Sequence, residues 1–331
     1  MNVLYTSNDN YAMLLGISLT SLYISNVNVN QINVYIVDDG IGDENKEKLL
    51  KTAKKYNREL FFIEMPQMYE LLGCRPDTLK WGDNIFCRLY IPTLFSEKLT
   101  IEKILYLDCD TIICSSLTDL WNCDLEGRFC AAGLECMGNL HKKLIGLKRE
   151  DVYVNSGVLL IDVKAWREHG IEQICTDFLH NHLRKLEYPD EGILNGTLKG
   201  KIKVLAPEYN LTSLKCTFTY QELKLYRRSA IMYEKEEYIK ALKHPVIIHY
   251  TSCFMIRRPW IYGERDHHFF EKEFLKMQSS SEWRDMPLIR QKEPVLRIIV
   301  RRGAAIWRLP VIFLCGIIYS YIKPLIKAGS R

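Results

Sequence analysis

Short apolar runs alternate with longer amphipathic segments through the first third of the chain. Residues 2–7, 32–39, 59–65 and 103–110 have the near-continuous apolar pattern of buried strands. The stretches between them, such as the lysine-rich segment 44–56, have the periodicity of helices. This alternation predicts an α/β fold in which a mostly parallel sheet is covered by helices on both faces.

Polar residues stand where several of these strands end. The sequences NDN, VDDG and DCD follow the first, second and fourth predicted strands. Further along, an apolar strand at 154–166 has Asn155 near its start, a helix is predicted at 189–196, and a late strand at 244–250 contains His249. Ligands bind outside the carboxyl ends of strands in such sheets. The pattern therefore predicts a binding cleft at one edge of the sheet.

Composition adds a division of the chain into two parts. The 331 residues are 47% hydrophobic and 26% charged, which is ordinary for a globular protein with a real core. From residue 288 onward there are nine Lys and Arg residues and one acid, a net charge of +8, whereas the whole chain carries +5. We expect a slightly acidic body at 1–265 and a basic helical region at 266–331.

Cysteine usage points to a reducing compartment. The chain has eleven cysteines, no CxxC pair, and an N-terminus that enters a strand directly, which favours reduced thiols in a cytosolic protein. Five of the cysteines fall between 109 and 136, a density that raises the possibility of zinc. Their spacings match no common zinc site, so small buried residues are the favoured interpretation.

Asp108 and Asp110 are the chemically informative pair. Residues two apart in a strand point to the same side, which would hold the carboxylates roughly 6–7 Å apart. At an effective dielectric of 20 their repulsion costs roughly 2–3 kcal/mol. A divalent cation relieves it, and oxygen ligands suit Mg²⁺ and Mn²⁺. The alternative is that both residues merely begin a loop.

Two enzyme classes place DxD after a buried strand. Phosphatases of the haloacid dehalogenase type carry it on the first strand, whereas here it follows the fourth, and no matching acidic motif lies downstream. Metal-dependent glycosyltransferases carry it after the nucleotide-binding half, which is the order found here. The chain resembles glycosyltransferase family 8, a group of retaining enzymes, in motifs that occur in family order over 2–260: VLYTSNDNYA, FCRLY, KILYLDCDTII, SLTDLW, VYVNSGVLLIDVKAWR, DEGILNG and HPVIIHY…RRPW.

The resemblance implies a nucleotide-diphospho-sugar transferase domain of the GT-A, Rossmann-like kind at 1–265. It also implies a metal site made by Asp108, Asp110 and His249, with Cys109 between the two aspartates at the diphosphate. Because imidazole suits Mn²⁺ better than the harder Mg²⁺, Mn²⁺ is the favoured cofactor and Mg²⁺ the alternative. The uridine of a UDP-sugar would be lined by Thr6, Asn8, Asn10 and Tyr11.

Further roles follow from the same motifs. Arg88 matches an arginine near the donor sugar and phosphate, and Ser252 with Arg257 or Arg258 would hold the phosphates. Residues matching the hexose end of the family site are Glu135, Asn155, Asp190 and Glu191. Asp190 and Glu191 are the predicted catalytic pair, although a helix-capping role for these acids is the local alternative. Glu191 stands where the family usually has Gln, and our hypothesis is that it stabilises an oxocarbenium-like species rather than attacking it.

The C-terminal region is expected to meet a membrane. An uncharged run at 309–322 spans 14 residues, about 21 Å as a helix, and is shorter than the roughly 20 residues needed to cross a bilayer. Arginines interleaved with apolar residues, and Trp307, Tyr319 and Tyr321, favour a helix lying in an anionic membrane surface. A helix pair packed on the body is the alternative, and nucleic acid is a poor fit.

Together these features predict a Mn²⁺-dependent retaining hexosyltransferase, peripheral on the inner face of the cell membrane. It would move galactose or glucose from a UDP-sugar to a glycan or lipid-linked acceptor in surface polysaccharide or lipopolysaccharide synthesis. The alternatives are a glycosyltransferase with a protein acceptor and a catalytically idle sugar-nucleotide-binding membrane scaffold.

Overall fold

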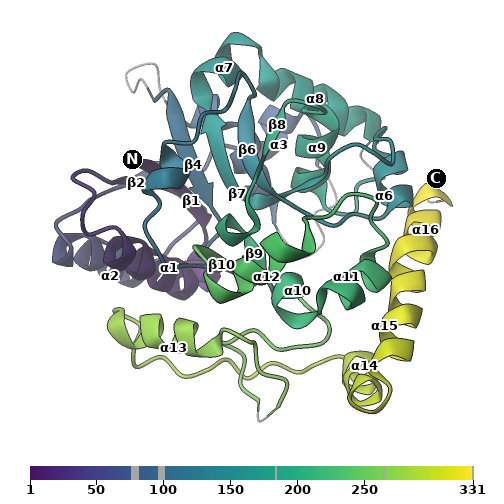
Figure 1. The fold of residues 1–331 in the computed structure, drawn as a ribbon. Helices are drawn as coiled ribbons and strands as arrows, with labels where there is room; N and C mark the ends of the chain where they lie inside the picture. Colours follow the sequence, from purple (N-terminus) through teal and green to yellow (C-terminus); the bar gives the residue numbers. More distant parts are fainter. Residues whose placement is uncertain (76–81, 96–100, 183–184, 264, 330–331) are drawn as a thin grey trace.

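A seven-stranded sheet forms the centre of the molecule in the computed structural model, which describes residues 1–75, 82–95, 101–182, 185–263 and 265–329 (Figure 1). Its strand order is β3-β2-β1-β4-β7-β6-β8. The strands are β1 Asn2–Ser7, β2 Asn33–Asp38, β3 Glu59–Glu64, β4 Lys103–Leu107, β6 Cys130–Leu134, β7 Val154–Asp162 and β8 Ile202–Leu205. β7 runs antiparallel to β4 and β6, and the other neighbouring pairs are parallel. The predicted mostly parallel sheet is confirmed.

Helices cover both faces of this sheet, as the strand pattern predicted. Val3 and Tyr5 of β1 pack into one hydrophobic cluster with α1 (Ala12–Ser25) and α2 (Asp43–Lys55). Leu4, between them, faces the other cluster with α7 (Val163–Glu168), α8 (Ile171–His182) and α9 (Pro189–Thr197), and Figure 1 shows the two layers. Because both faces are buried at the centre of the sheet, the central strands β1, β2 and β4 have near-continuous apolar runs.

Three predicted strands are shorter in the structure. The predicted strand at 103–110 ends at Leu107, so Asp108 and Asp110 lie in the turn that follows it and not within the strand. β7 ends at Asp162 because this side chain caps α7, its Oδ1 accepting a hydrogen bond from the Ala165 N–H at 2.8 Å. The late strand is only three residues long, β10 (Ile247–His249). It belongs to a second, three-stranded sheet with β5 (Thr111–Ile113) and β9 (Leu211–Thr212), lying against the large sheet's carboxyl edge.

Shorter helices connect these elements. The α-helices are α3 Met68–Leu72, α4 Ile91–Leu94, α5 Thr118–Trp121, α6 Asn139–Leu144, α10 Ser213–Thr217, α11 Tyr220–Arg227, α12 Lys235–Lys243 and α13 Glu271–Ser280. The 3₁₀ helices are η1 Asp9–Tyr11, η2 Asp83–Leu89 and η3 Pro207–Tyr209.

The last helices pack on the body by one side. They are α14 (Val295–Ile306), α15 (Arg308–Ile317), the π-helical turn η4 (Ile318–Ile322) and α16 (Lys323–Gly329). α15 lies along α11, as Figure 1 shows at its yellow end. Within this contact, Arg308 Nε lies 2.6 Å from Glu222 Oε1. The alternative prediction for the C-terminal region, a helix pair packed on the body, therefore describes the inner side of these helices.

The outer side of the same helices is apolar and exposed. Trp307 is 71% exposed and Ile306 78%, and the other large exposed side chains are Val295, Leu296, Ile299, Leu309, Phe313, Leu314, Ile318, Tyr321, Ile322, Leu325 and Ile326. Helix runs without a break from Arg308 to Gly329, which is 22 residues and longer than the uncharged run alone. By length and composition this segment is able to cross a membrane, and core helices of soluble proteins share these properties.

The segment just after residue 265 packs on the body. α13 contacts α1, and Trp283, which is 2% exposed, sits against Gly16. The exposed apolar face begins later, at Val295. The division of the chain at 265/266 stays a prediction. Arg331, counted in the basic region, lies outside the described residues.

Candidate active site

Several chain segments meet at one edge of the sheet because β7 is antiparallel. The start of β7 lies beside the carboxyl ends of β4 and β6, so Asn155 and Ser156 lie near Asp108 and Glu135. A cavity of about 470 Å³ opens there. The predicted site residues that line it are Thr6, Asn8, Tyr11, Arg88, Asp108, Cys109, Asp110, Glu135, Asn155, Asp190, Glu191, His249, Ser252 and Arg258. The VDDG turn contributes indirectly, since Asn84 on the cavity wall donates to Asp39.

Two predicted residues lie outside the cavity lining. Asn10 is exposed on η1. Arg257 turns toward the C-terminal region, where its Nη2 lies 2.8 Å from Glu293 Oε2 and its Nη1 donates to the carbonyl of Tyr262. Arg258 instead faces the cavity and donates to the Ser252 hydroxyl. Of the two arginines that the sequence left open, Arg258 is therefore the one placed to contact a ligand.

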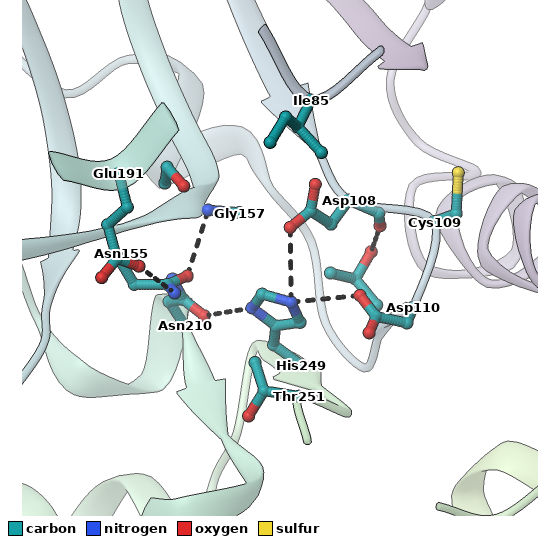
Figure 2. Close-up of polar contacts among 12 residues, drawn as sticks. Ile85, Asp108, Cys109, Asp110, Asn155, Gly157, Glu191, Asn210, His249 and Thr251 are labelled. Carbon is teal, nitrogen blue, oxygen red and sulfur yellow. Dashed lines mark hydrogen bonds and ion pairs between the residues drawn. The ribbon is translucent and has the colours of Figure 1, made fainter. Parts of the chain in front are cut away.

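Asp108, Asp110 and His249 form a compact group whose ligand atoms all lie within 4.8 Å of one another. The pairing of β5 with β10 creates it, because His249 is the partner of Thr111, one residue after Asp110. The His249 Nε2 atom is 3.1 Å from Asp110 Oδ1 and 3.5 Å from Asp108 Oδ2, as Figure 2 shows. Among the residues that the structure describes, this is the one group of three or more such ligands.

This group fits a divalent cation. Two carboxylates and an imidazole are suitable donors for Mn²⁺ or Mg²⁺. Gly157 keeps the space free: a Cβ there would lie 2.2 Å from His249 Cε1 and 2.5 Å from Asp108 Oδ2. The cysteines are all free thiols, and none of them joins a group of metal-ligating residues in the described part of the chain.

Arg88 carries a fixed positive charge between two acidic segments. It is buried, and its Nη2 lies 2.9 Å from Asp108 Oδ1 while its Nη1 lies 3.2 Å from Asp190 Oδ2. Burial alone would lower the pKa of the guanidinium, but the neighbouring acids outweigh it and raise this pKa. The ion pairs join the end of β4 to the start of α9.

Asp110 is held in its charged form. Burial would raise the pKa of this carboxyl, yet His249 beside it, with Arg258 farther away, outweighs burial and lowers the pKa below its usual value. An ionised carboxylate is the form that binds a cation.

Glu191, in contrast to Asp110, has a raised pKa. Burial, and then the nearby Glu135 and Asp190, raise its pKa to about 8. The Nδ2 of Asn155 donates to Glu191 Oε2 at 2.9 Å. The neutral acid is therefore the main form of Glu191 at pH 7.

Among the residues of this site that sequence reasoning missed, Asn210 and Arg227 contact predicted site residues. Asn210 is fully buried and contacts both His249 and Asn155. It follows β8 and η3, so the strand-end rule applied to β8 would have identified it. Arg227 lines the cavity and its Nη2 lies 3.2 Å from Glu135 Oε1. Nothing in the local sequence marks Arg227, because its place depends on how α11 packs.

Comparison with known proteins identifies relatives of this chain. The protein-family model described as "Glycosyl transferase family 8" matches residues 2–262. General stress protein A of Bacillus subtilis is 27% identical over 288 residues, covering 86% of this chain and 94% of that protein. A putative glycosyltransferase of Haemophilus influenzae is 32% identical over 223 residues, covering 64% and 63%. Lipopolysaccharide 1,2-glucosyltransferase of Escherichia coli K12 is 26% identical over 264 residues, covering 78% and 72%.

Solved structures share the fold. An active-site mutant of LgtC matches with a TM-score of 0.70 and 24% identity, covering 85% of this chain and 96% of that chain. The galactosyltransferase LgtC in complex with donor and acceptor sugar analogues matches with a TM-score of 0.69 and 22% identity, with the same coverage. These matches confirm the predicted fold class.

Proposed function

This chain belongs to glycosyltransferase family 8, and we propose that it is a retaining hexosyltransferase that moves glucose or galactose from a UDP-sugar to a glycan or lipid-linked acceptor. The observation that carries the proposal is the group formed by Asp108, Asp110 and His249, with Arg88 beside it, in a cavity at the sheet edge. Such a group suits a cation–diphosphate pair, and the family match supplies the sugar nucleotide as its source.

The uridine would lie at the β1 end of the cavity. Thr6 Oγ1 and Asn8 Oδ1 are buried there and have no hydrogen-bond partner among the described residues, so both are available to a ligand. The Asn8 carbonyl is suited to accept the N–H of uracil. Tyr11 is 43% exposed, which leaves its ring free to stack on a base.

The diphosphate would lie between the aspartates and Arg258. A divalent cation bound by Asp108, Asp110 and His249 would stabilise the charge that develops on the leaving UDP. Arg258 presents a guanidinium that pairs with phosphate oxygens in a fork geometry. Arg88 orients Asp108 and Asp190, so the metal end and the hexose end of the site are held in register.

The hexose would lie against Asp190 and Glu191. The Ser156 hydroxyl donates to Asp190 Oδ2 at 2.8 Å, which fixes the carboxylate that faces the sugar. Because the neutral form of Glu191 predominates at pH 7, its carboxyl is a weak nucleophile and resembles the glutamine usual in the family. This supports a role in stabilising the oxocarbenium-like species. Detection of a glycosyl–Glu191 adduct by mass spectrometry would overturn it.

The donor hexose and the acceptor follow from relatives and from the tail. One relative is named as a lipopolysaccharide glucosyltransferase and LgtC as a galactosyltransferase, so both hexoses stay in the proposal. The exposed apolar face of α14–α16, together with the basic charge of this region, suits an anionic membrane surface. We therefore place the enzyme on the cytosolic, inner face of the cell membrane, where surface glycans are assembled on lipid carriers.

Release of free UDP from a panel of UDP-sugars, with and without Mn²⁺, tests this function. We expect slow Mn²⁺-dependent hydrolysis of one donor, reduced on the order of 100-fold in Asp110→Asn. Asp285→Asn, at a fully exposed carboxylate, is the matched control. If no donor turns over, calorimetry with UDP decides: metal-dependent binding indicates a missing acceptor, and absent binding contradicts the proposal. Turnover would also exclude an idle scaffold.

A further inference from the structure

We propose that Asn210 is a positioning residue that fixes the tautomer of His249, so that the imidazole directs the Nε2 lone pair at a cation held by Asp108 and Asp110. This inference rests on the proposed function for the identity of the bound group. Its geometry rests on a chain of hydrogen bonds that Figure 2 shows from Gly157 to His249.

A backbone N–H group determines which atoms donate and which accept in this series of hydrogen bonds. The Gly157 N–H, which only donates, lies 3.1 Å from the side-chain Oδ1 of Asn155. The atom facing it must be the carbonyl oxygen of the amide, since an NH₂ group cannot accept. The other end of the same amide, Nδ2, then donates to Glu191 Oε2 at 2.9 Å, which is chemically consistent.

The orientation of the Asn155 amide determines that of the Asn210 amide, and Asn210 in turn determines which imidazole nitrogen carries a proton. Its side chain contacts Asn155 Oδ1 at 2.8 Å, and because that oxygen accepts, Asn210 must present its NH₂ group there. The carbonyl Oδ1 of Asn210 consequently faces His249 Nδ1 at 3.0 Å. A carbonyl only accepts, so Nδ1 carries the proton.

With Nδ1 engaged by Asn210, Nε2 is the ring nitrogen left to bind a cation. This atom faces carboxylate oxygens of Asp110 and Asp108 at 3.1 Å and 3.5 Å. Without a cation, a proton on Nε2 can be shared with Asp110, and a cation that displaces this proton is bound by all three groups. Hydrogen bonds to the second ring nitrogen are how proteins orient metal-binding histidines.

The surroundings of Asn210 hold the residue in place, and its two side-chain hydrogen bonds fix the orientation of its amide. The residue is fully buried, and its backbone carbonyl accepts a hydrogen bond from Lys215 Nζ at 3.1 Å. Gly133 packs directly against it: a Cβ at that glycine would lie 2.7 Å from the Asn210 Cβ. These hydrogen bonds therefore connect Glu191, at the proposed hexose end of the cavity, to His249, at the proposed metal end, through two side-chain amides of fixed orientation.

Nitrogen-15 NMR of histidine-labelled, metal-free protein at pH 8.5 reads the tautomer directly. We expect Nδ1 of His249 to carry a proton in the wild type. Asn210→Leu keeps the branched shape of the side chain and removes the acceptor, so we expect Nδ1 to lose its proton and Nε2, which faces Asp110, to carry one. Asn210→Asp keeps an acceptor toward Nδ1 and is expected to keep the wild-type tautomer.

Calorimetric titration with Mn²⁺ supplies a second readout. We expect Asn210→Leu to raise the Mn²⁺ Kd by about 10–100-fold. The matched control is Asn26→Leu, since Asn26 is a buried asparagine whose Oδ1 accepts from the Leu117 N–H far from the cavity. It should change neither the His249 tautomer nor the Mn²⁺ affinity.

These outcomes separate this inference from the proposed function. A wild-type His249 without a proton on Nδ1, or a folded Asn210→Leu variant with wild-type Mn²⁺ affinity, would overturn the inference. Should Asn210→Leu fail to fold, the wild-type and Asn210→Asp spectra still decide the tautomer. A wild type that binds neither Mn²⁺ nor UDP would contradict the proposed function, whereas the tautomer would still be read from the spectrum.

Discussion

Gly157 leaves space at the site because it has no side chain. It lies at the start of β7, opposite Asp108, whose N–H donates to the Gly157 carbonyl at 2.8 Å. The three candidate metal ligands meet only because no Cβ stands between His249 and Asp108. The glycine therefore leaves room for the cation, while Arg88 contributes a positive charge beside Asp108.

Gly157→Ala should weaken metal binding without unfolding the protein. The added methyl group would overlap His249 Cε1 and Asp108 Oδ2, so one ligand must move. We expect at least a tenfold rise in the Mn²⁺ Kd, measured by calorimetry, with a near-native circular dichroism spectrum. Gly303→Ala, where the nearest contact is an ordinary 3.5 Å, is the control. Unchanged affinity in Gly157→Ala would show that the cation binds elsewhere.

Glu191→Gln should alter the pH dependence of stability. The carboxyl titrates near 4.5 in the unfolded chain and near 8 in the folded protein, so the folded state holds the extra proton between these values. The wild-type free energy of unfolding therefore falls as pH rises through that window, and glutamine, which does not titrate, avoids the loss. We expect the variant to gain on the order of 4 kcal/mol relative to wild type between pH 5 and pH 9.

Urea denaturation at pH 5, 7 and 9 measures this difference. Glu44→Gln, at a side chain that is 83% exposed, is the control for loss of a carboxylate at the surface. A difference between Glu191→Gln and wild type that stays constant across the three pH values would contradict the raised pKa.

At the scale of elements, local pattern predicted most segments and tertiary contacts decided their partners. The runs at 2–7, 44–56 and 59–65 are a strand, a helix and a strand within about a residue of the predicted bounds. Alternating burial and helical periodicity are properties of neighbouring residues, which is why they are visible in the sequence. The membership of β10 in a separate sheet is not visible, because strand pairing joins residues distant along the chain.

The contact between α15 and α11 should be sensitive to a single methyl group. A Cβ at Gly316 would lie 2.9 Å from the carbonyl oxygens of both Leu225 and Tyr226, so the two helix backbones must separate. We expect Gly316→Ala to lower the free energy of unfolding by about 1–3 kcal/mol, although alanine favours a helix. Chemical denaturation measures this, and the helical Gly303→Ala should be neutral or stabilising. Equal effects at both glycines would mean that α15 is not packed on α11.

At the scale of the whole molecule, the C-terminal region joins the candidate active site to the exposed apolar face. The Tyr319 ring lies 4.2 Å from the guanidinium of Arg227, which in turn pairs with Glu135 on the cavity wall. On the opposite side of the same helices, Trp307 and Leu325 are exposed. Removing everything after Pro287 would therefore damage the cavity as well as the apolar face, so surface substitutions are the sharper test.

Replacing exposed apolar residues should release the protein from membranes. We expect the wild type to float with liposomes of anionic lipid, and the triple variant Trp307→Ser, Leu314→Ser, Leu325→Ser to stay in the soluble fraction, since burial of apolar area drives such binding. Val27→Ser, at a residue that is 65% exposed on the body, is the control. Flotation of the triple variant at wild-type levels would contradict a membrane role for this face.

The sequence by itself determined the strand and helix pattern, the mostly parallel sheet, the family, the strand-end position of Asp108 and Asp110, and the basic charge of the tail. These are properties of short segments or of ordered motifs, so they need no knowledge of distant contacts. The tertiary structure alone decided that Arg258 faces the cavity, that Arg227 pairs with Glu135, and that Asn210 contacts both His249 and Asn155. Each of these depends on strand register and helix packing between segments far apart in the chain, where the free energy of burial, rather than local preference, selects the arrangement.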